Sequence, residues 1–180
     1  MTLKYTLYEK DYLEFHLYIA STNKRLKNQR LKSTLTLVGI SIFLALLRLI
    51  QGSEFDAYFF SAIGLVFLVL FPFYQRYFYK AHYKRFVADA YKKRFGLIST
   101  VVLGEDDIFT ANSMVEIKFF LSAFEDIEET GNYFYAKVKS GEMLIVPKSE
   151  VDKDAVRSYF QSLAQQLNIP YTANLNWKWK

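Results

Sequence analysis

Two long runs of apolar residues interrupt a chain that otherwise mixes apolar and polar positions. The first run covers Ser33 to Ile50 and the second covers Ala57 to Tyr74, and each is 18 residues long. A helix needs ~17–25 such residues to cross a bilayer. Neither run has the polar stripe of a helix that rests on a soluble core. The pattern predicts membrane-spanning helices at 33–51 and 57–75, joined by an outer loop at 52–56.

The segments that flank these runs have helical spacing of a different kind. Residues 76–96 place aromatic side chains at three- and four-residue steps with basic residues between them. This indicates a juxtamembrane helix that continues the second span and stops at Gly96. A similar helix is expected from Lys10 to Leu31, after a short strand near residues 3–8. Residues 1–32 are therefore expected to form a cytoplasmic strand and helix.

After residue 97 the pattern changes to short alternating segments separated by turn residues, which is typical of strands. Six strands are predicted, at 98–103, 107–111, 114–119, 124–128, 133–139 and 143–147. An apolar stripe then predicts one closing helix, capped by Ser149 or Asp152 and ended by Asn168 and Pro170. Residues 97–170 thus read as a small α+β domain with an antiparallel sheet, which the strand near the N-terminus could complete. Residues 171–180 are left as a tail that docks on the membrane or is unstructured.

The charge distribution gives the two apolar runs an orientation. The net charge is +5, but residues 1–96 carry 15 basic and 6 acidic side chains, whereas residues 97–180 carry 8 and 12. The loop at 52–56 has no Lys or Arg, and basic residues crowd the other ends of both runs. By the positive-inside rule, the chain is expected to be a multi-pass protein of the cell membrane with both termini in the cytoplasm.

The basic residues are expected to meet the anionic lipids of the inner leaflet. In a soluble protein they would read as a nucleic-acid patch, but the apolar runs favour the bilayer, and no nucleic-acid partner is expected. The candidate membrane-boundary residues are Arg30, Lys32, Arg48, Arg76, Lys80, Lys84 and Arg85.

Arg48 is the one charge within either run. It lies near the end of its helix, where a long side chain can reach the headgroups. Glu54 and Asp56 of the connection are its expected neighbours. A role in lining an ion pathway is the alternative, but the spans offer no oppositely charged partner.

Several local stretches are similar to one family. Tyr5–Tyr12, the two apolar runs, Leu103–Ile108 and Thr130–Ser149 resemble the YcxB-like family of small bacterial membrane proteins. The resemblance implies that the C-terminal domain has a pleckstrin-homology-like fold. It carries no catalytic residues that could be transferred to this chain.

The residue types needed for most catalytic sites are scarce. Cysteine is absent, which excludes disulfides and thiolate chemistry. His16 and His82 have no metal-ligand partner at helical spacing. The carboxylates at 105–107 and 125–129 read as turn residues and solvated strand edges rather than as an acid–base pair or a magnesium site. We expect neither an enzyme nor a cofactor.

Lys148 and Ser149 are the candidate ligand contacts, because a strand ends and a helix begins there. Backbone N–H groups at a helix start, beside a lysine, can hold a phosphate. The alternative is a capped helix entry with no ligand.

Three functions compete. The leading hypothesis is a membrane-anchored binding or scaffolding module, whose partner is an unknown protein or a second copy. The alternative is a permeation or transport role through oligomerised hairpins, packed through small residues. A lipid-modifying membrane enzyme would need a set of acid, base or metal ligands that the sequence does not display.

Overall fold

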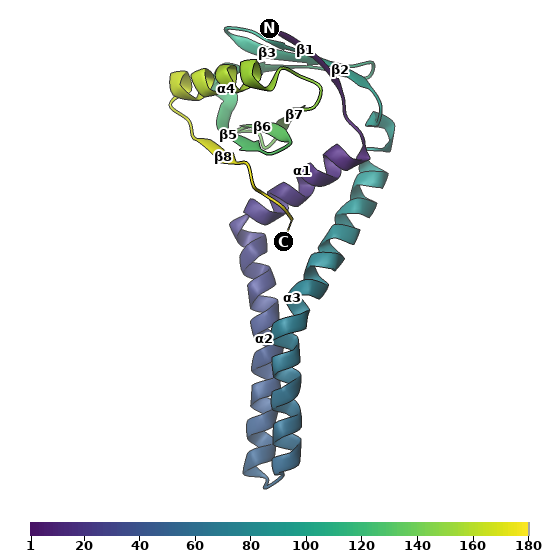
Figure 1. Ribbon diagram of the computed structural model, residues 1–180, viewed down its shortest axis with the longest axis vertical. Coiled ribbons are helices and arrows are strands. Elements are labelled where there is room, and N and C mark those ends of the chain that lie inside the picture. Colours follow the sequence, from purple (N-terminus) through teal and green to yellow (C-terminus); the bar gives the residue numbers. More distant parts are fainter. Residues whose placement is uncertain (180) are drawn as a thin grey trace. The chain divides into compact units, whose positions relative to one another are not determined.

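The computed structural model describes residues 1–179, which form four α-helices and eight β-strands (Figure 1). The chain divides into two compact units. The first contains Met1–Phe15 and Val87–Lys178, and the second contains His16–Phe86 with Trp179. Lys180, the last residue of the predicted tail, lies outside the described residues.

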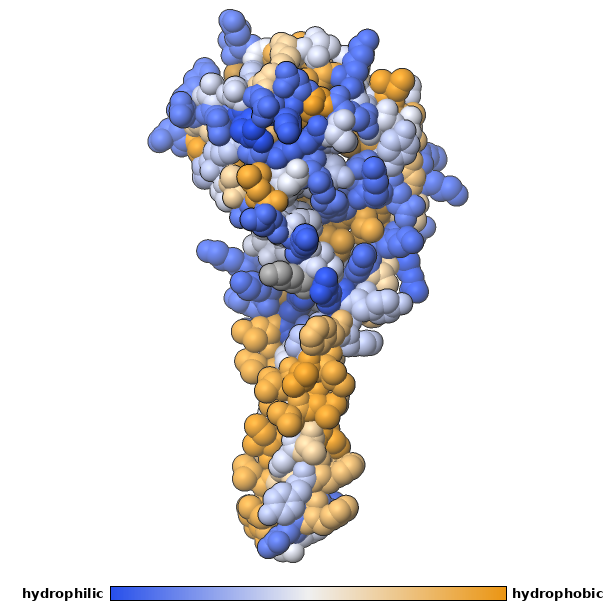
Figure 2. All heavy atoms as spheres, viewed as in Figure 1, coloured by the Kyte–Doolittle hydropathy of each residue, from blue (hydrophilic) through white to orange (hydrophobic). Residues whose placement is uncertain are grey.

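The second unit is built on two long helices. α2 covers Lys24–Ile50 and α3 covers Glu54–Ala90. Both are long and apolar enough to cross a membrane, and only 17% and 11% of their most apolar windows are buried. A helix in the core of a soluble protein would be buried on most of its surface. Figure 2 shows hydrophobic residues gathered over these two helices.

Small residues bring α2 and α3 together. Ser41 and Ala45 of α2 are buried, as is Ala57 of α3. A Cβ atom added at Gly64 would lie 3.1 Å from the Ser41 Cβ atom. At the other end of the pair, Gln75 Nε2 donates to the Arg30 carbonyl oxygen over 3.2 Å.

The first unit contains two four-stranded sheets. One has the order β1-β2-β3-β4, with strands Thr2–Thr6, Ile98–Leu103, Asp107–Ala111 and Glu116–Phe120. The other has the order β7-β6-β5-β8, with strands Met143–Pro147, Tyr133–Val138, Phe124–Thr130 and Tyr171–Asn174. α4, Lys153–Leu167, packs against β5 and the short 3₁₀ helix Leu121–Ala123. The predicted fold class, a mixed chain of long apolar helices and a β-rich domain with a closing helix, is confirmed at this level.

The N-terminal strand completes the first sheet, as the sequence suggested. β1 pairs antiparallel with β2, with Thr2 opposite Val102 and Thr6 opposite Ile98. The Met1 amino group donates to the Leu103 carbonyl oxygen over 2.9 Å. Leu3 and Tyr5 are buried. The compact domain is therefore discontinuous in sequence, and the α-helical hairpin is inserted between its first and second strands.

Buried residues of the first unit alternate along β1, follow one another without a break along most of β6 and β7, and form a stripe on α4. They include Val101, Ile108, Phe124, Ile127, Phe134, Val146, Val156 and Phe160. Burying a side chain of this size contributes about 1.5–3 kcal/mol. The apolar stripe predicted the buried face of α4, whereas the alternation did not predict that Tyr133–Ala136 of β6 would be buried on both faces.

Three details differ from the prediction. The helix expected over 10–31 is broken, because α1, Glu9–Thr22, ends at Thr22 and the Asn23 side chain caps α2 by accepting from the amides of Arg25 and Leu26. α3 ends at Ala90, before the predicted stop at Gly96, and a 3₁₀ helix at Lys92–Arg94 follows. β8 was not predicted, and it pairs parallel with β5. The N-cap of α4 is Asp152, one of the two predicted caps.

Candidate functional site

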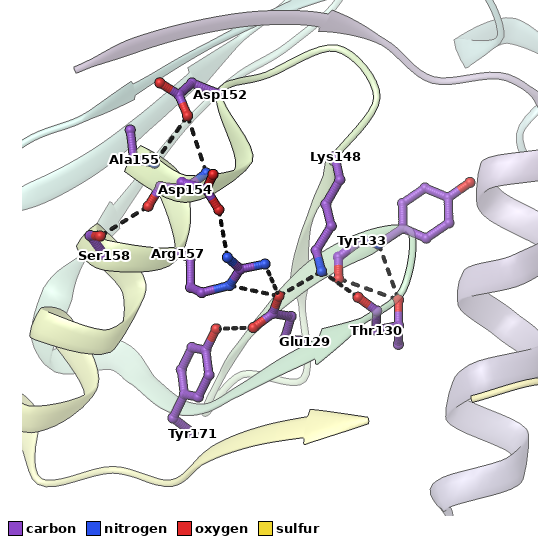
Figure 3. Close-up of polar contacts among 10 residues, drawn as sticks. All are labelled: Glu129, Thr130, Tyr133, Lys148, Asp152, Asp154, Ala155, Arg157, Ser158 and Tyr171. Carbon is purple, nitrogen blue, oxygen red and sulfur yellow. Dashed lines mark hydrogen bonds and ion pairs between the residues drawn. The ribbon is translucent and has the colours of Figure 1, made fainter. Parts of the chain in front are cut away.

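The predicted ligand contact Lys148 lies in a cluster of charged residues around Glu129 (Figure 3). Glu129, at the end of β5, is 2% exposed. Its Oε1 atom accepts from Lys148 Nζ over 2.6 Å and from Arg157 Nε and Nη2 over 3.0 and 2.9 Å. Its Oε2 atom accepts from the Tyr171 hydroxyl over 2.5 Å. One carboxylate thus joins β5 to the end of β7, to α4 and to β8.

Further donors of the two cations are also used inside the domain. Lys148 Nζ donates to the Thr130 carbonyl oxygen over 2.5 Å and lies 4.7 Å from the centre of the Phe134 ring. Arg157 Nη1 donates to Asp154 Oδ1 over 2.6 Å. The ammonium of Lys148 therefore points into the domain. A ligand that enters from solvent would have to displace Glu129 from the ammonium.

The electrostatics of the cluster fix Glu129 in its ionised form. Burial raises the pKa of Glu129, but hydrogen bonds from Arg157, Lys148 and Tyr171 outweigh burial and lower the pKa to about 2. Burial and the bond to Glu129 raise the pKa of the Tyr171 hydroxyl. A carboxylate that is saturated with donors and has so low a pKa is a poor proton acceptor at neutral pH. The cluster therefore supports the fold rather than acid–base chemistry.

Ser149, the second candidate ligand contact, is exposed in the turn that follows β7. The helix begins only at Lys153, and its first amides, those of Asp154 and Ala155, donate to Asp152 Oδ1 over 3.1 and 3.2 Å. The predicted phosphate site required free helix amides beside Lys148. The structure instead shows the alternative, a capped helix entry.

The solvated-edge interpretation of residues 125–129 is wrong for Glu129, which is buried. It fits Glu125 better, since that side chain is part-exposed and pairs with Lys137 over 2.5 Å. Burial raises the pKa of Asp126, the residue that follows Glu125 on β5. The sequence could not separate these carboxylates, because the partners of Glu129 come from distant parts of the chain.

The predicted membrane-boundary residues of α2 and α3 gather at the two ends of the helix pair. Arg30 and Arg76 lie at the level of the hydrogen bond between Gln75 and the Arg30 carbonyl. Arg48 lies at the connection, where its Nη1 donates to Gln51 over 3.1 Å and its Nε is 3.8 Å from Asp56 Oδ2. The expected proximity of Arg48 to Asp56 is thus confirmed. The other boundary residues, Lys32, Lys80, Lys84 and Arg85, are exposed.

Trp179 is a contact that the sequence did not predict. Its indole Nε1 donates to the Arg76 carbonyl oxygen over 3.2 Å, and the Arg30 guanidinium lies 5.1 Å from its ring centre. Arg30 also lies 5.5 Å from the centre of the Tyr79 ring. Trp179 is buried against the helix pair, and not free as in the unstructured alternative for the tail.

Among residues 1–179, no group of three or more His, Asp or Glu side chains is arranged to hold a metal ion. No curated protein and no solved structure matches the chain. A family model does match about a third of it, over a segment that runs from the end of β2 into α4. Residues 103–163 match the family described as YcxB-like protein, the family that the sequence resemblance indicated.

Proposed function

We propose that this chain is a non-enzymatic membrane-anchored module that holds a small protein-binding domain at the cytoplasmic face of a bacterial membrane. In this proposal α2 and α3 cross the bilayer as a hairpin. The domain built from β1–β8 and α4 faces the cytoplasm and binds a protein partner or a second copy.

One observation supports the anchoring most directly: the charged residues at the two ends of the helix pair are separated by close to the thickness of a bilayer core. Lys32 and Arg48 are 16 residues apart on α2, and Asp56 and Arg76 are 20 residues apart on α3. At 1.5 Å per residue these spacings are about 24 and 30 Å. The hydrocarbon core of a bilayer is ~30 Å thick, and the long side chains of Lys and Arg can reach its surface from a somewhat shorter span. Between these charged residues most of the exposed side chains are Leu, Ile, Phe and Val.

The orientation follows from where the positive charges lie. The end near Arg30 and Arg76 also carries Lys32, Lys80 and Lys84, whereas Arg48 at the other end is paired with Asp56. Lys and Arg are retained on the cytoplasmic side during insertion. This supports a cytoplasmic location for both termini and contact between the basic residues and anionic lipids.

The arrangement of the domain supports a binding role. Two four-stranded sheets with one helix, α4, between the seventh and eighth strands suit a pleckstrin-homology-like fold, which we propose for it. The best-organised charged cluster, around Glu129, is closed on itself, so it offers no group for catalysis. A membrane enzyme therefore finds less support than a binding module.

The permeation alternative also finds less support. Of the small residues that could pack one hairpin on another, Ser41 and Gly64 are already in contact within the hairpin, whereas Gly39 is exposed. Most outward side chains between the charged residues are apolar, with Ser33 and Thr36 at one end as exceptions, so they offer little lining for ions or polar solutes.

Single cysteines test the anchoring and the orientation, because the natural chain has none. Glu54→Cys lies beside the connection of the hairpin, and Ser140→Cys lies in the domain. In intact cells stripped of their outer layers, an impermeant maleimide should label position 54, and position 140 only after permeabilisation. Release of the protein by alkaline carbonate, or the reverse labelling pattern, would reject the proposal.

The binding role is tested separately by a photoreactive residue placed at exposed positions of the domain in intact cells. A discrete crosslinked product, identified by mass spectrometry, is expected from the domain. Absence of any product across the scanned positions would remove the binding role and leave the anchoring intact.

A further inference from the structure

β4 forms an open edge of the first sheet. In the order β1-β2-β3-β4 it is the last strand, and no strand within residues 1–179 pairs with its outer side. The residues in and just before β4 expose apolar side chains: Met114 is 59% exposed, Val115 42% and Phe120 63%. An exposed apolar edge is a template for another strand.

The hydrogen bonds of the β3–β4 pair fix which backbone groups face outward. The Asn112 amide donates to the Val115 carbonyl oxygen over 3.0 Å, and the Leu121 amide donates to the Asp106 carbonyl oxygen over 3.2 Å. In an antiparallel pair, hydrogen-bonded positions alternate along the strand. Residues 115, 117, 119 and 121 therefore bond to β3. The amides and carbonyls of Glu116, Lys118 and Phe120 point to the open edge.

We propose that two copies of this chain pair through their β4 edges, antiparallel and centred on Ile117. This register places Glu116 opposite Lys118 of the second copy, and Lys118 opposite Glu116 of the second copy. Ile117 faces its own equivalent, and Met114 faces Phe120. The contact is two-fold symmetric, as expected for a homodimer.

Charge complementarity selects this register. The outward backbone groups also permit registers centred on Glu116 or on Lys118, but these place like charges directly opposite each other. Like charges at opposed positions are unfavourable, and opposite charges are favourable. Centring on Ile117 forms two Glu–Lys pairs and places the exposed Met114 and Phe120 opposite each other, with Val115 opposite the buried Phe119.

The existing contacts of Lys118 are compatible with this pairing. Its Nζ atom lies 2.8 Å from Asp107 Oδ2 and 5.7 Å from the centre of the Phe120 ring, with 55% of the side chain exposed. An ammonium has three donors. Asp107 occupies one donor and holds the lysine on the same face as Glu116, so a second carboxylate can be accepted there.

This inference deepens the proposed binding function and rests on it, since it names the partner as a second copy. It does not need a particular orientation in the membrane, although confinement to one membrane would raise the effective concentration of the strands.

Charge reversal in full-length chains tests the pairing. Two differently tagged copies are co-expressed and solubilised in detergent, one is captured by its tag, and the amount of the other is measured. Glu116→Lys paired with itself, and Lys118→Glu paired with itself, should each lower capture about tenfold, because two attractive contacts become repulsive. Glu116→Lys co-expressed with Lys118→Glu should restore capture to the wild-type amount, since every opposed pair is again oppositely charged.

The restored pair also shows that both variants fold. No capture of wild type, equal capture in all combinations, or failure of the mixed pair to recover would each overturn the β4 pairing. None of these outcomes affects the cysteine labelling that tests the anchoring, and crosslinks from the domain to a different protein would support binding without self-pairing.

Discussion

The Tyr133 hydroxyl on β6 donates a 2.6 Å hydrogen bond to Oδ1 of Asp11, 122 residues earlier in the chain. Asp11 lies in the first turn of α1, Glu9–Thr22, and is 3% exposed. Its Oδ2 atom accepts from the Tyr8 amide over 2.7 Å, which caps the helix start. One buried carboxylate therefore caps α1 and ties it to the sheet of the domain.

Tyr133→Phe should lower the free energy of unfolding by about 1–3 kcal/mol, because it leaves Asp11 buried with an unsatisfied oxygen. Thermal or chemical unfolding of the detergent-solubilised protein measures this. Tyr8→Phe is the matched control, since Tyr8 is half-exposed and should change stability by less than about 0.5 kcal/mol. Equal effects of the two substitutions would show that the bond to Asp11 does not stabilise the fold.

The Glu129 cluster predicts a specific loss of stability in acid. The pKa of Glu129 falls from its ordinary value of 4.5 to about 2 in the folded protein. As the pH falls from 4.5 towards 2, the unfolded chain takes up a proton that the folded chain does not, so unfolding becomes more favourable. The stabilisation is complete above pH 4.5 and is lost by about pH 2.

Glu129→Gln should be less stable at neutral pH and should show a shallower decline over this pH range. Glu125→Gln is the control, because its partner Lys137 is part-exposed and the pair is accessible to solvent. Unfolding midpoints at a series of pH values measure both. A decline in Glu129→Gln as steep as in wild type would place the acid sensitivity elsewhere.

Substitutions at the adjacent residues 148 and 149 test whether the end of β7 has a structural role or binds a ligand. Lys148→Ala removes one partner of the buried Glu129 and should cost about 3–5 kcal/mol of stability. Ser149→Ala, in the exposed turn, should change stability by less than about 0.5 kcal/mol. Unfolding curves of the two variants check this. A stable Lys148→Ala variant would mean that the ammonium is not needed to hold the carboxylate.

The hairpin contact can be tested by two glycines. Gly64→Val should lower the thermal stability of the solubilised protein, because its Cβ atom lies 3.1 Å from the Ser41 Cβ atom before any branching methyl is added. Overpacking of this kind costs about 1–3 kcal/mol. Gly39→Val is the control, since a Cβ atom there meets nothing within 4 Å. Equal loss in both variants would indicate an effect of the β-branched residue rather than of the contact.

The spacing of apolar residues was sufficient to predict most helices and strands, because most of these elements have a recognisable pattern within their own residues. β1 alternates, the turn at Gly141 has the positive φ of 92° that the Ser140-Gly141 pair suggested, and α4 carries a regular apolar stripe. The break at Asn23 was missed although Ser21, Thr22 and Asn23 are weak helix formers and are favoured N-cap residues. In the structure the Asn23 side chain accepts from two amides of α2 and so marks the new start.

The charged cluster could not be predicted, because nothing local distinguishes Glu129 from the carboxylates beside it. Its donors lie 19, 28 and 42 residues away. β8 and Trp179 were missed for a related reason. Each is a short segment that forms structure only against another part of the chain, and in isolation it resembles a polar tail.

Because the hairpin is inserted into the first unit, we can predict which fragment of the chain folds alone. A fragment of residues 97–178 lacks β1, so the sheet loses its edge strand and the buried Leu3 and Tyr5, and we expect it to aggregate or remain unfolded. A second fragment keeps residues 1–15 and 87–178, the whole first unit, and replaces the hairpin by a Gly/Ser linker. About 20 such residues span roughly 25 Å.

The joined fragment should be soluble without detergent and should unfold cooperatively, since it retains β1, the bond between Asp11 and Tyr133 and the Glu129 cluster. Circular dichroism and size-exclusion chromatography of the two fragments measure this. If residues 97–178 folded as well as the joined fragment, β1 would be dispensable. If the joined fragment still required detergent, the domain itself, and not only the helices of the hairpin, would expose the surface that holds the protein to the membrane.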